Sequence, residues 1–486
     1  MNKSIRKLGF VLLLCYGVLF AQLTNVHLVK AKQYNASPIN NREIIRDFSV
    51  ERGTIITTDG VIVADSVPSN DKYDFQRTYP TNDLFAPVTG WFSFLYGTGG
   101  VERTYNDQLT GQIAKEQDPG LAALLKGKKP SDVVLTLRSD LQQVAKDALG
   151  EREGAVVALD PRSGAILALW SYPTFDPNKL ATHDFALART ARAEYEADAA
   201  KPLLSGAYGE RYFPGSTFKI VTASAGLESG QVTVDAPSYP VTATYTPPLT
   251  TNPIRNFGGE TCGGTLMEIL AVSCNTAFAQ MGVDLGPEIM VERSEAFGFN
   301  SKPPLDLPSA AVSNFPSVKS FDRNTPALAQ SAFGQNDVQA SPLQMAMVAG
   351  AIANGGRIMA PHVMSEIRDE NQQVVQRYQP TVWRIATSPA TAAIMRDAMV
   401  GVVQRGTATR LSINGVTVAG KTGTAQLGTE KPSSHAWIVG FAPAEEPRVA
   451  VAVLIKAQPG VSEVTGGTVA APVAKAVLEN ALAVNP

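Results

Sequence analysis

The stretch YFPGSTFK, residues 212–219, places Ser216 and Lys219 three positions apart. Positions i and i+3 share one face of a helix, so the lysine amine can lie beside the serine hydroxyl. A serine hydroxyl is a weak nucleophile until an adjacent base takes its proton, and lysine can be that base once burial or a neighbouring positive charge lowers its pKa. The helix N-terminus adds backbone N–H groups that point at an anionic intermediate. The stretch therefore predicts a nucleophilic serine, although a single Ser-x-x-Lys tetrad is more often a solvated helix face.

Two further polar motifs lie downstream and supply hydroxyl, amide and amine groups: Ser273-x-Asn275 and Lys421-Thr422-Gly423-Thr424. The first interrupts a helical pattern between residues 266 and 281, and the second lies in a β-prone stretch, residues 416–426. The three motifs together are much more specific than any one of them, and they favour a catalytic site over a solvated helix face.

A competing interpretation comes from residues 415–422, GVTVAGKT, which match the phosphate-loop pattern G-x-x-x-x-G-K-[ST]. A phosphate loop needs a strand before its first glycine and a helix after its lysine. Here the β-prone residues lie between the two glycines, and Gly423 stands where the helix should begin. The context therefore disfavours a nucleotide-binding protein.

The three motifs resemble the active-site motifs of the penicillin-binding proteins and serine β-lactamases. The resemblance extends from about residue 52 to the end of the chain and is greatest to the class B penicillin-binding proteins, especially their actinobacterial members. It implies a D,D-transpeptidase that cross-links D-Ala-D-Ala stem peptides of peptidoglycan outside the cytoplasmic membrane, in cell division or cell-shape control, and that β-lactams acylate. It implies no metal and no organic cofactor. A β-lactamase, a D,D-carboxypeptidase and a non-enzymatic sensor share the same motifs and remain open alternatives.

The resemblance also implies a role for each motif residue. Ser216 attacks the carbonyl between the two D-alanines, and Lys219 is its base. Ser273 relays a proton to the leaving amine, Asn275 orients Lys219, and the charge of Lys421 keeps Lys219 neutral. The expected substrate-binding residues are Thr422, Gly423 and Thr424.

The order of patterns along the chain predicts an α+β fold. A strand at residues 132–137, a helix to residue 149 and a hairpin at 154–170 precede several helices, of which residues 341–355 are apolar throughout. Three consecutive strands follow residue 416, so we expect an antiparallel sheet packed with helices. A long surface loop is expected at 232–253 and a short helix at 121–130. The expected domains are an anchor (1–26), an N-terminal pedestal or interaction domain (27–150) and a penicillin-binding transpeptidase domain (151–486).

The N-terminus carries Lys3, Arg6 and Lys7 ahead of an apolar run at residues 8–23. Extended to residue 26, the run is long enough to span a membrane, and the basic residues place its N-terminus in the cytoplasm. A cleaved signal peptide is the alternative, but the end of the run lacks a small-x-small cleavage site. We therefore expect a single-pass membrane protein with an extracytoplasmic catalytic domain and a polar stalk at residues 27–50.

The cysteine, histidine and charge content bears on three further features: a disulfide, a metal site and nucleic-acid binding. Outside the membrane, Cys262 and Cys274 can form a disulfide, and two buried free thiols are the alternative; the sequence leaves both open. Four scattered histidines and three cysteines make a metal site improbable. A net charge of −2 gives no general attraction to nucleic acid. A glycosyltransferase and division proteins are further expected partners from the resemblance.

Overall fold

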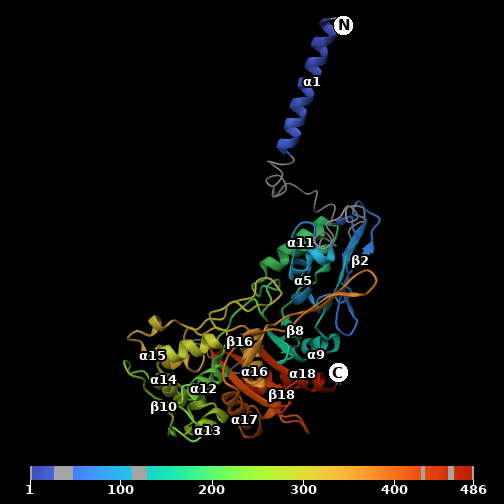
Figure 1. Ribbon diagram of the computed structural model, residues 1–486. Helices are drawn as coiled ribbons and strands as arrows, with labels where there is room; N and C mark the ends of the chain where they lie inside the picture. Colours follow the sequence, from blue (N-terminus) through green and yellow to red (C-terminus); the bar gives the residue numbers. More distant parts are fainter. Residues whose placement is uncertain (1–2, 27–47, 112–128, 428–432, 458–464, 484–486) are drawn as a thin grey trace. The chain divides into compact units, whose positions relative to one another are not determined.

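The computed structural model describes residues 3–26, 48–111, 129–427, 433–457 and 465–483 (Figure 1). The chain divides into two compact units, residues 1–51 with 68–76 and residues 52–67 with 77–486. In the first unit, α1 (Lys3–Thr24) is long and apolar enough to cross a membrane, and it buries none of its residues. This helix is consistent with the predicted anchor. Most of the predicted stalk and of the helix predicted at 121–130 lies outside the described residues.

A five-stranded antiparallel sheet lies at the centre of the second unit, in the order β17-β18-β19-β7-β8. The strands are β7 (Gly154–Leu159), β8 (Ile166–Tyr172), β17 (Ala419–Gln426), β18 (Ser434–Ala442) and β19 (Val449–Ile455). Every residue of β7, β18 and β19 is buried, which explains why these strands read as nearly continuous apolar runs. The hairpin and the three late strands of the sequence prediction are confirmed, although β17 begins only at Ala419, because Val416 forms a bridge with Ile413 instead.

Helices pack on both faces of this sheet and bury it. The central one is α16 (Pro342–Ala353), which packs on β7, β18 and β19 and confirms the predicted apolar helix. Its N-cap Ser341 accepts a hydrogen bond from the Gln344 backbone N–H, and a proline occupies its first turn, where the missing donor costs nothing. On the other face lie α9 (Ser139–Leu149) and α18 (Ala471–Ala483), which also pack on each other. The predicted α+β class is therefore confirmed.

A second sheet combines strands from the first third of the chain with two strands between residues 364 and 377, in the order β15-β14-β6-β1-β2-β3. Its strands are β1 (Ile55–Ile56), β2 (Ile62–Pro68), β3 (Phe75–Thr78), β6 (Asp132–Leu135), β14 (Met364–Arg368) and β15 (Val374–Arg377). The β1–β2 hairpin turns at Gly60, whose φ of 85° favours glycine. The pairing of β14 with β6 has no counterpart in the sequence prediction. Short elements beside this sheet are α4 (Ala86–Thr89), β4 (Phe92–Ser93), β5 (Gly97–Thr98), α5 (Gly100–Thr104) and α6 (Asn106–Leu109).

A buried ion cluster holds this N-terminal region together. The carboxylate of Glu102 is fully buried and accepts hydrogen bonds from Arg52 Nε at 2.6 Å, Arg77 Nε at 2.7 Å and the Tyr79 hydroxyl at 3.2 Å. Burial by itself raises the pKa of Glu102, but the two guanidinium groups outweigh it and hold the pKa below its usual value. The ionised carboxylate is therefore held between two cations, and these three groups carry a net charge of +1.

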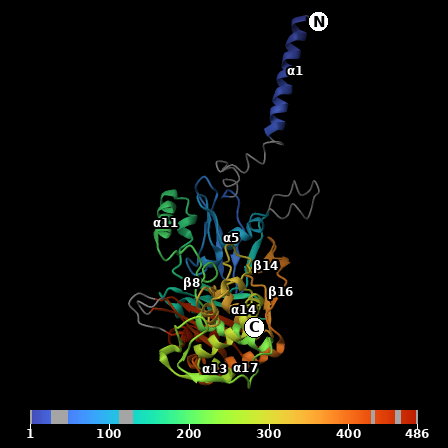
Figure 2. The same ribbon diagram turned by 90° about the vertical axis from the view of Figure 1, so that its left-hand side faces the viewer.

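The remaining α-helices among the described residues belong to the second unit. They are α10 (Asn178–Ala181), α11 (Phe185–Ala197), α12 (Lys219–Glu228), α13 (Leu266–Ala271), α14 (Asn275–Ala296), α15 (Thr325–Ser331) and α17 (Pro389–Arg405). In both views α13 and α17 lie side by side (Figure 1, Figure 2). The loop predicted at 232–253 contains two short strands, β9 (Tyr239–Thr242) and β10 (Thr244–Tyr245), which pair with β12 (Cys262–Gly264) and β11 (Ile254–Arg255). Another two-stranded sheet joins β13 (Arg357–Met359) to β16 (Val382–Ile385).

Candidate active site

Ser216 lies in a single 3₁₀ turn, η2 (Gly215–Phe218), which leads directly into α12. The preceding Gly215 has a φ of 53°, and a Cβ there would lie 2.8 Å from the backbone oxygen of Thr424 on β17. Its N–H donates to the carbonyl of Gly334 at 3.0 Å. A side chain at this position would be strained and would push the turn away from the sheet. The glycine thus lets the half-buried Ser216 lie close to the edge of β17.

Lys219 begins α12 and is fully buried. Its Nζ donates to the Ser273 carbonyl at 2.7 Å, the Ser273 Oγ at 3.2 Å and the Asn275 Oδ1 at 2.7 Å. Burial, and then the charge of Lys421, lower the pKa of Lys219 well below the usual lysine range. Because a hydroxyl can donate as well as accept, Ser273 is a suitable partner for the neutral amine too. The site therefore favours the form of Lys219 that can accept a proton.

Ser273 connects α13 to α14 and has a φ of 61°, a left-handed conformation that is uncommon for a residue with a side chain. Such a conformation costs about 1–3 kcal/mol and persists only where the surroundings impose it. It turns the Ser273 hydroxyl towards both lysines, since the Nζ of Lys421 donates to the same Oγ at 2.8 Å. The hydroxyl thus bridges two buried amines.

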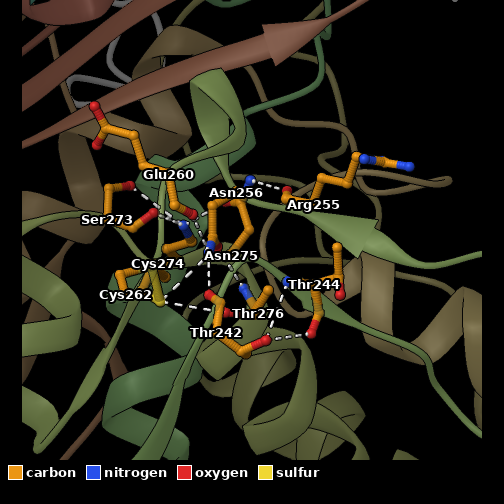
Figure 3. Close-up of a disulfide and its surroundings, with 11 residues drawn as sticks. Thr242, Thr244, Arg255, Asn256, Glu260, Cys262, Ser273, Cys274, Asn275 and Thr276 are labelled. Carbon is orange, nitrogen blue, oxygen red and sulfur yellow. Dashed lines mark hydrogen bonds between the residues drawn. A yellow bond between two sulfur atoms is a disulfide. The ribbon is translucent and has the colours of Figure 1, made fainter.

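An arm formed by residues 239–264 is covalently linked to the segment that carries Ser273 (Figure 3). A disulfide joins Cys262 on β12 to Cys274, with an S–S distance of 2.14 Å and a Cα–Cα distance of 5.8 Å. Of the two alternatives that the sequence leaves open, the structure therefore has the disulfide. Because Cys274 stands between Ser273 and Asn275, the cross-link restrains both polar residues.

Asn256 provides the second link between the arm and the start of α14. Its Nδ2 donates to the carbonyls of Thr242 and Glu260, and its Oδ1 accepts from the Thr276 N–H at 3.0 Å (Figure 3). The neighbouring carbonyl of Arg255 accepts from the Asn275 Nδ2 at 3.1 Å. With its amino group held in this way, Asn275 presents its Oδ1 to Lys219. The arm therefore determines which end of the amide faces the lysine.

Strand β17 supplies the third motif from the edge of the central sheet. Lys421 is fully buried, donates to the carbonyl of Thr422 as well as to Ser273, and has its pKa lowered to about 7 by burial. A Cβ at Gly423 would lie 2.9 Å from the backbone oxygen of Pro214, so only glycine lets the Ser216 turn pack this closely. The third motif thus contacts both the Ser216 turn, through Gly423, and the Ser273 hydroxyl, through Lys421.

A cavity of about 590 Å³ lies where the three motifs meet. The predicted site residues that line it are Ser216, Ser273, Asn275, Thr422 and Thr424. Gly423 was predicted to bind substrate, and the structure places it against the Ser216 turn, outside the cavity lining. The three motifs, far apart in the sequence, thus meet at one cavity.

Further lining residues have no motif that announces them in the sequence. They include Arg255, Glu260, Phe333, Gln335, Thr407, Gln426 and Thr465. Most come from loops whose approach to the cavity depends on long-range packing, so no spacing or periodicity signals them. Within the described residues, no group of three or more His, Cys, Asp or Glu side chains could hold a metal ion.

Comparison with known proteins connects this geometry to a family. The penicillin binding protein transpeptidase domain matches residues 154–479, and the penicillin binding protein A dimerisation domain matches residues 52–133. The chain is 37% identical to the peptidoglycan D,D-transpeptidase PbpA of Mycolicibacterium smegmatis over 99% of both chains. It is 35% identical to PbpA of Mycobacterium tuberculosis strain H37Rv over 100% of both.

Solved structures agree with the sequence comparison. The ceftriaxone acyl-enzyme complex of penicillin-binding protein A from M. tuberculosis has a TM-score of 0.82 and 35% identity, covering 90% of this chain and 100% of that one. A D,D-transpeptidase domain from Eggerthella lenta has a TM-score of 0.78 and 37% identity, covering 90% and 99%. The chain therefore belongs to the penicillin-binding protein transpeptidase family, and it is a D,D-transpeptidase.

Proposed function

We propose that this peptidoglycan D,D-transpeptidase joins stem peptides ending in D-Ala-D-Ala through an acyl-enzyme at Ser216, with Lys219 as the base. The observation that carries the proposal is the Ser273 hydroxyl, which lies 3.2 Å from the Nζ of Lys219 and 2.8 Å from that of Lys421. Both amines are buried, and the Ser216 side chain lines the cavity beside them. This arrangement combines a nucleophile, a base of lowered pKa and a proton relay.

In the proposed acylation, the neutral amine of Lys219 takes the proton of the Ser216 hydroxyl as its oxygen attacks the carbonyl between the two D-alanines. The C–N bond then breaks, and the nitrogen of the departing D-alanine receives a proton through the Ser273 hydroxyl. The backbone N–H groups of Ser216 and Thr424 are the proposed donors to the oxyanion. The packing of Gly215 against Thr424, which brings the turn to the edge of β17, supports this assignment.

In the second half-reaction, an amine of a neighbouring stem peptide attacks the ester and the same groups act in reverse.

The proposed partners of the donor's terminal carboxylate are the hydroxyls of Thr422 and Thr424, which line the cavity. Lys421 next to Thr422 favours an anion when it is protonated, because its buried charge is poorly screened by solvent. Asn275 is proposed to orient Lys219 and to hydrogen-bond the peptide.

The proposed domain arrangement keeps this chemistry outside the cytoplasmic membrane. We propose α1 as a single-pass anchor with its basic N-terminal end in the cytoplasm, residues 27–150 as the pedestal and residues 151–486 as the transpeptidase domain. The match of a dimerisation domain to residues 52–133 supports an interaction role for the pedestal. A glycosyltransferase and division proteins are the proposed partners of this region.

Intact mass spectrometry of the full-length chain in detergent tests the assignment of the nucleophile. After incubation with penicillin G, we expect one stable adduct on the wild-type chain and none on folded Ser216→Ala. An adduct that persists in Ser216→Ala would refute this nucleophile. Rapid loss of the adduct with release of hydrolysed drug would instead show a β-lactamase. Incubation with a D-Ala-D-Ala peptide and an acceptor amine should yield the cross-linked product.

A further inference from the structure

We propose that Thr407 is a positioning residue for carboxylate recognition: its hydroxyl directs the proton of the Thr422 hydroxyl towards an anionic ligand in the cavity. The inference rests on the proposed function, because it concerns the carboxylate that Thr422 is proposed to bind. The carrying observation is a hydrogen bond of 2.6 Å between the Thr407 and Thr422 Oγ1 atoms, at the wall of the cavity that both residues line.

Tight backbone packing places Thr407 opposite Thr422. Thr407 follows the end of α17, and its N–H donates to the carbonyl of Ala271 at 3.2 Å, at the end of α13. A Cβ at the preceding Gly406 would lie 2.2 Å from that same oxygen. On its other side, a Cβ at Gly467 would lie 2.4 Å from the Thr407 carbonyl oxygen. The Thr407 backbone is therefore held between two other segments, the end of α13 and the segment of Gly467, and its hydroxyl has a defined position.

The direction of the proton in this pair decides whether Thr422 can bind an anion. Each hydroxyl has one proton to donate. If Thr422 donates to Thr407, only its lone pairs remain for the ligand, and these repel a carboxylate. If Thr407 donates to Thr422, the Thr422 proton is free for a charge-assisted hydrogen bond, which the first bond strengthens by polarisation. A bound carboxylate selects the second arrangement.

If the hydrogen bond between Thr407 and Thr422 only held the loop in place, loss of the Thr407 hydroxyl would mainly lower stability. Thr407 is exposed to the cavity, and its loop is already fixed by backbone contacts on both sides. The hydroxyl is therefore not needed to hold the loop in place. Its loss should affect recognition of an anion much more than stability of the fold.

The test measures the second-order rate constant of acylation for the full-length chain with penicillin G and with its methyl ester, which lacks the carboxylate charge. Thr407→Val removes the hydroxyl and keeps the shape, and we expect an acylation rate about 3- to 10-fold lower with penicillin G. With the ester we expect less than about a 2-fold change, because the ester presents no anion to Thr422. Thr407→Ser should restore most of the rate with penicillin G.

Two further variants make the result specific. Thr409→Val makes the same chemical change at an exposed threonine in the same segment that does not line the cavity, and it should leave both rates unchanged. In a Thr422→Val background, adding Thr407→Val should cost no more than about 2-fold, since Thr407 then has no hydroxyl to orient.

The acylation rates distinguish the positioning role of Thr407 from the alternatives. Equal losses with the acid and the ester, or a wild-type rate for Thr407→Val, would overturn the inference. A full additional loss in the Thr422→Val background would show direct contact between Thr407 and the ligand, and would overturn the positioning role. Failure of the wild-type chain to react with either compound would instead count against the proposed function.

Discussion

Lys219 and Lys421 donate hydrogen bonds to the same atom, the Oγ of Ser273. Two ammonium groups that share one buried acceptor repel each other, so protonation of one disfavours protonation of the other. The pKa of Lys219 is accordingly lowered by burial and by the charge of Lys421, and that of Lys421 is lowered to about 7 by burial. The two amines are therefore expected to titrate as a coupled system, below the usual lysine range.

This coupling predicts the pH dependence of acylation. The rate should rise with pH as Lys219 loses its proton, with an acidic limb far below the usual lysine pKa of 10.5. Lys421→Met removes a positive charge beside Lys219 and therefore raises the pKa of Lys219. The acidic limb of the rate profile should then move to higher pH. The profile of acylation by penicillin G between pH 5 and about 10 would measure the shift.

The control for this prediction is Lys475→Met, which removes a partly exposed lysine on α18. Its pH profile should match that of the wild-type chain. An acidic limb that stays in place in Lys421→Met would mean that Lys421 does not control the protonation of Lys219.

The close packing of the Ser216 turn against β17 predicts a sensitive glycine. Gly215→Ala forces an alanine into a φ of 53° and brings its Cβ to the backbone oxygen of Thr424. We expect the turn to shift and the acylation rate to fall at least about 10-fold, as small displacements of reacting groups cost rate steeply. Stopped-flow acylation of the folded variant would measure the loss.

Gly230→Ala is the matched control for this substitution. Gly230 has a φ of 72°, and a Cβ there would meet no atom within 4 Å. The alanine should therefore lower stability by about 1 kcal/mol through backbone strain alone and leave acylation unchanged. Equal acylation rates in the two variants would show that the contact with β17 does not position Ser216.

The buried ion cluster of the N-terminal region predicts a pH-dependent contribution to stability. Glu102→Gln removes the carboxylate that pairs with both Arg52 and Arg77, and it should lower the free energy of unfolding by about 3–5 kcal/mol at pH 7. The folded-state pKa of Glu102 is below its usual value of 4.5, so the wild-type advantage is present above pH 4.5. It should decline as the pH falls through the folded-state pKa.

Denaturant unfolding at several pH values would measure this difference, with Glu196→Gln as the control. Glu196 pairs with Arg192 on the exposed surface of α11, so its substitution should change stability little at any pH. A Glu102→Gln variant as stable as the wild-type chain at pH 7 would contradict the prediction.

Local features of the sequence determined the candidate nucleophile and its base, the buried strands and the family resemblance. The i, i+3 spacing of Ser216 and Lys219 requires only that a helix begins there, and the structure has that helix as a 3₁₀ turn leading into α12. The apolar runs that became β7, β18 and β19 predicted buried strands, because a strand covered on both faces needs apolar side chains on both. The family resemblance followed from the same short motifs.

Only the tertiary structure decided how the motifs meet. Ser273 contacts Lys219 across 54 residues of sequence and Lys421 across 148, and no periodicity encodes such distances. The same holds for Thr407, which stands near Thr422 only because Gly406 and Gly467 let three backbones approach. Local chemistry can be read from residue types, since it depends on neighbours in the chain. The orientation of a hydroxyl or an amide depends on groups that only folding brings together.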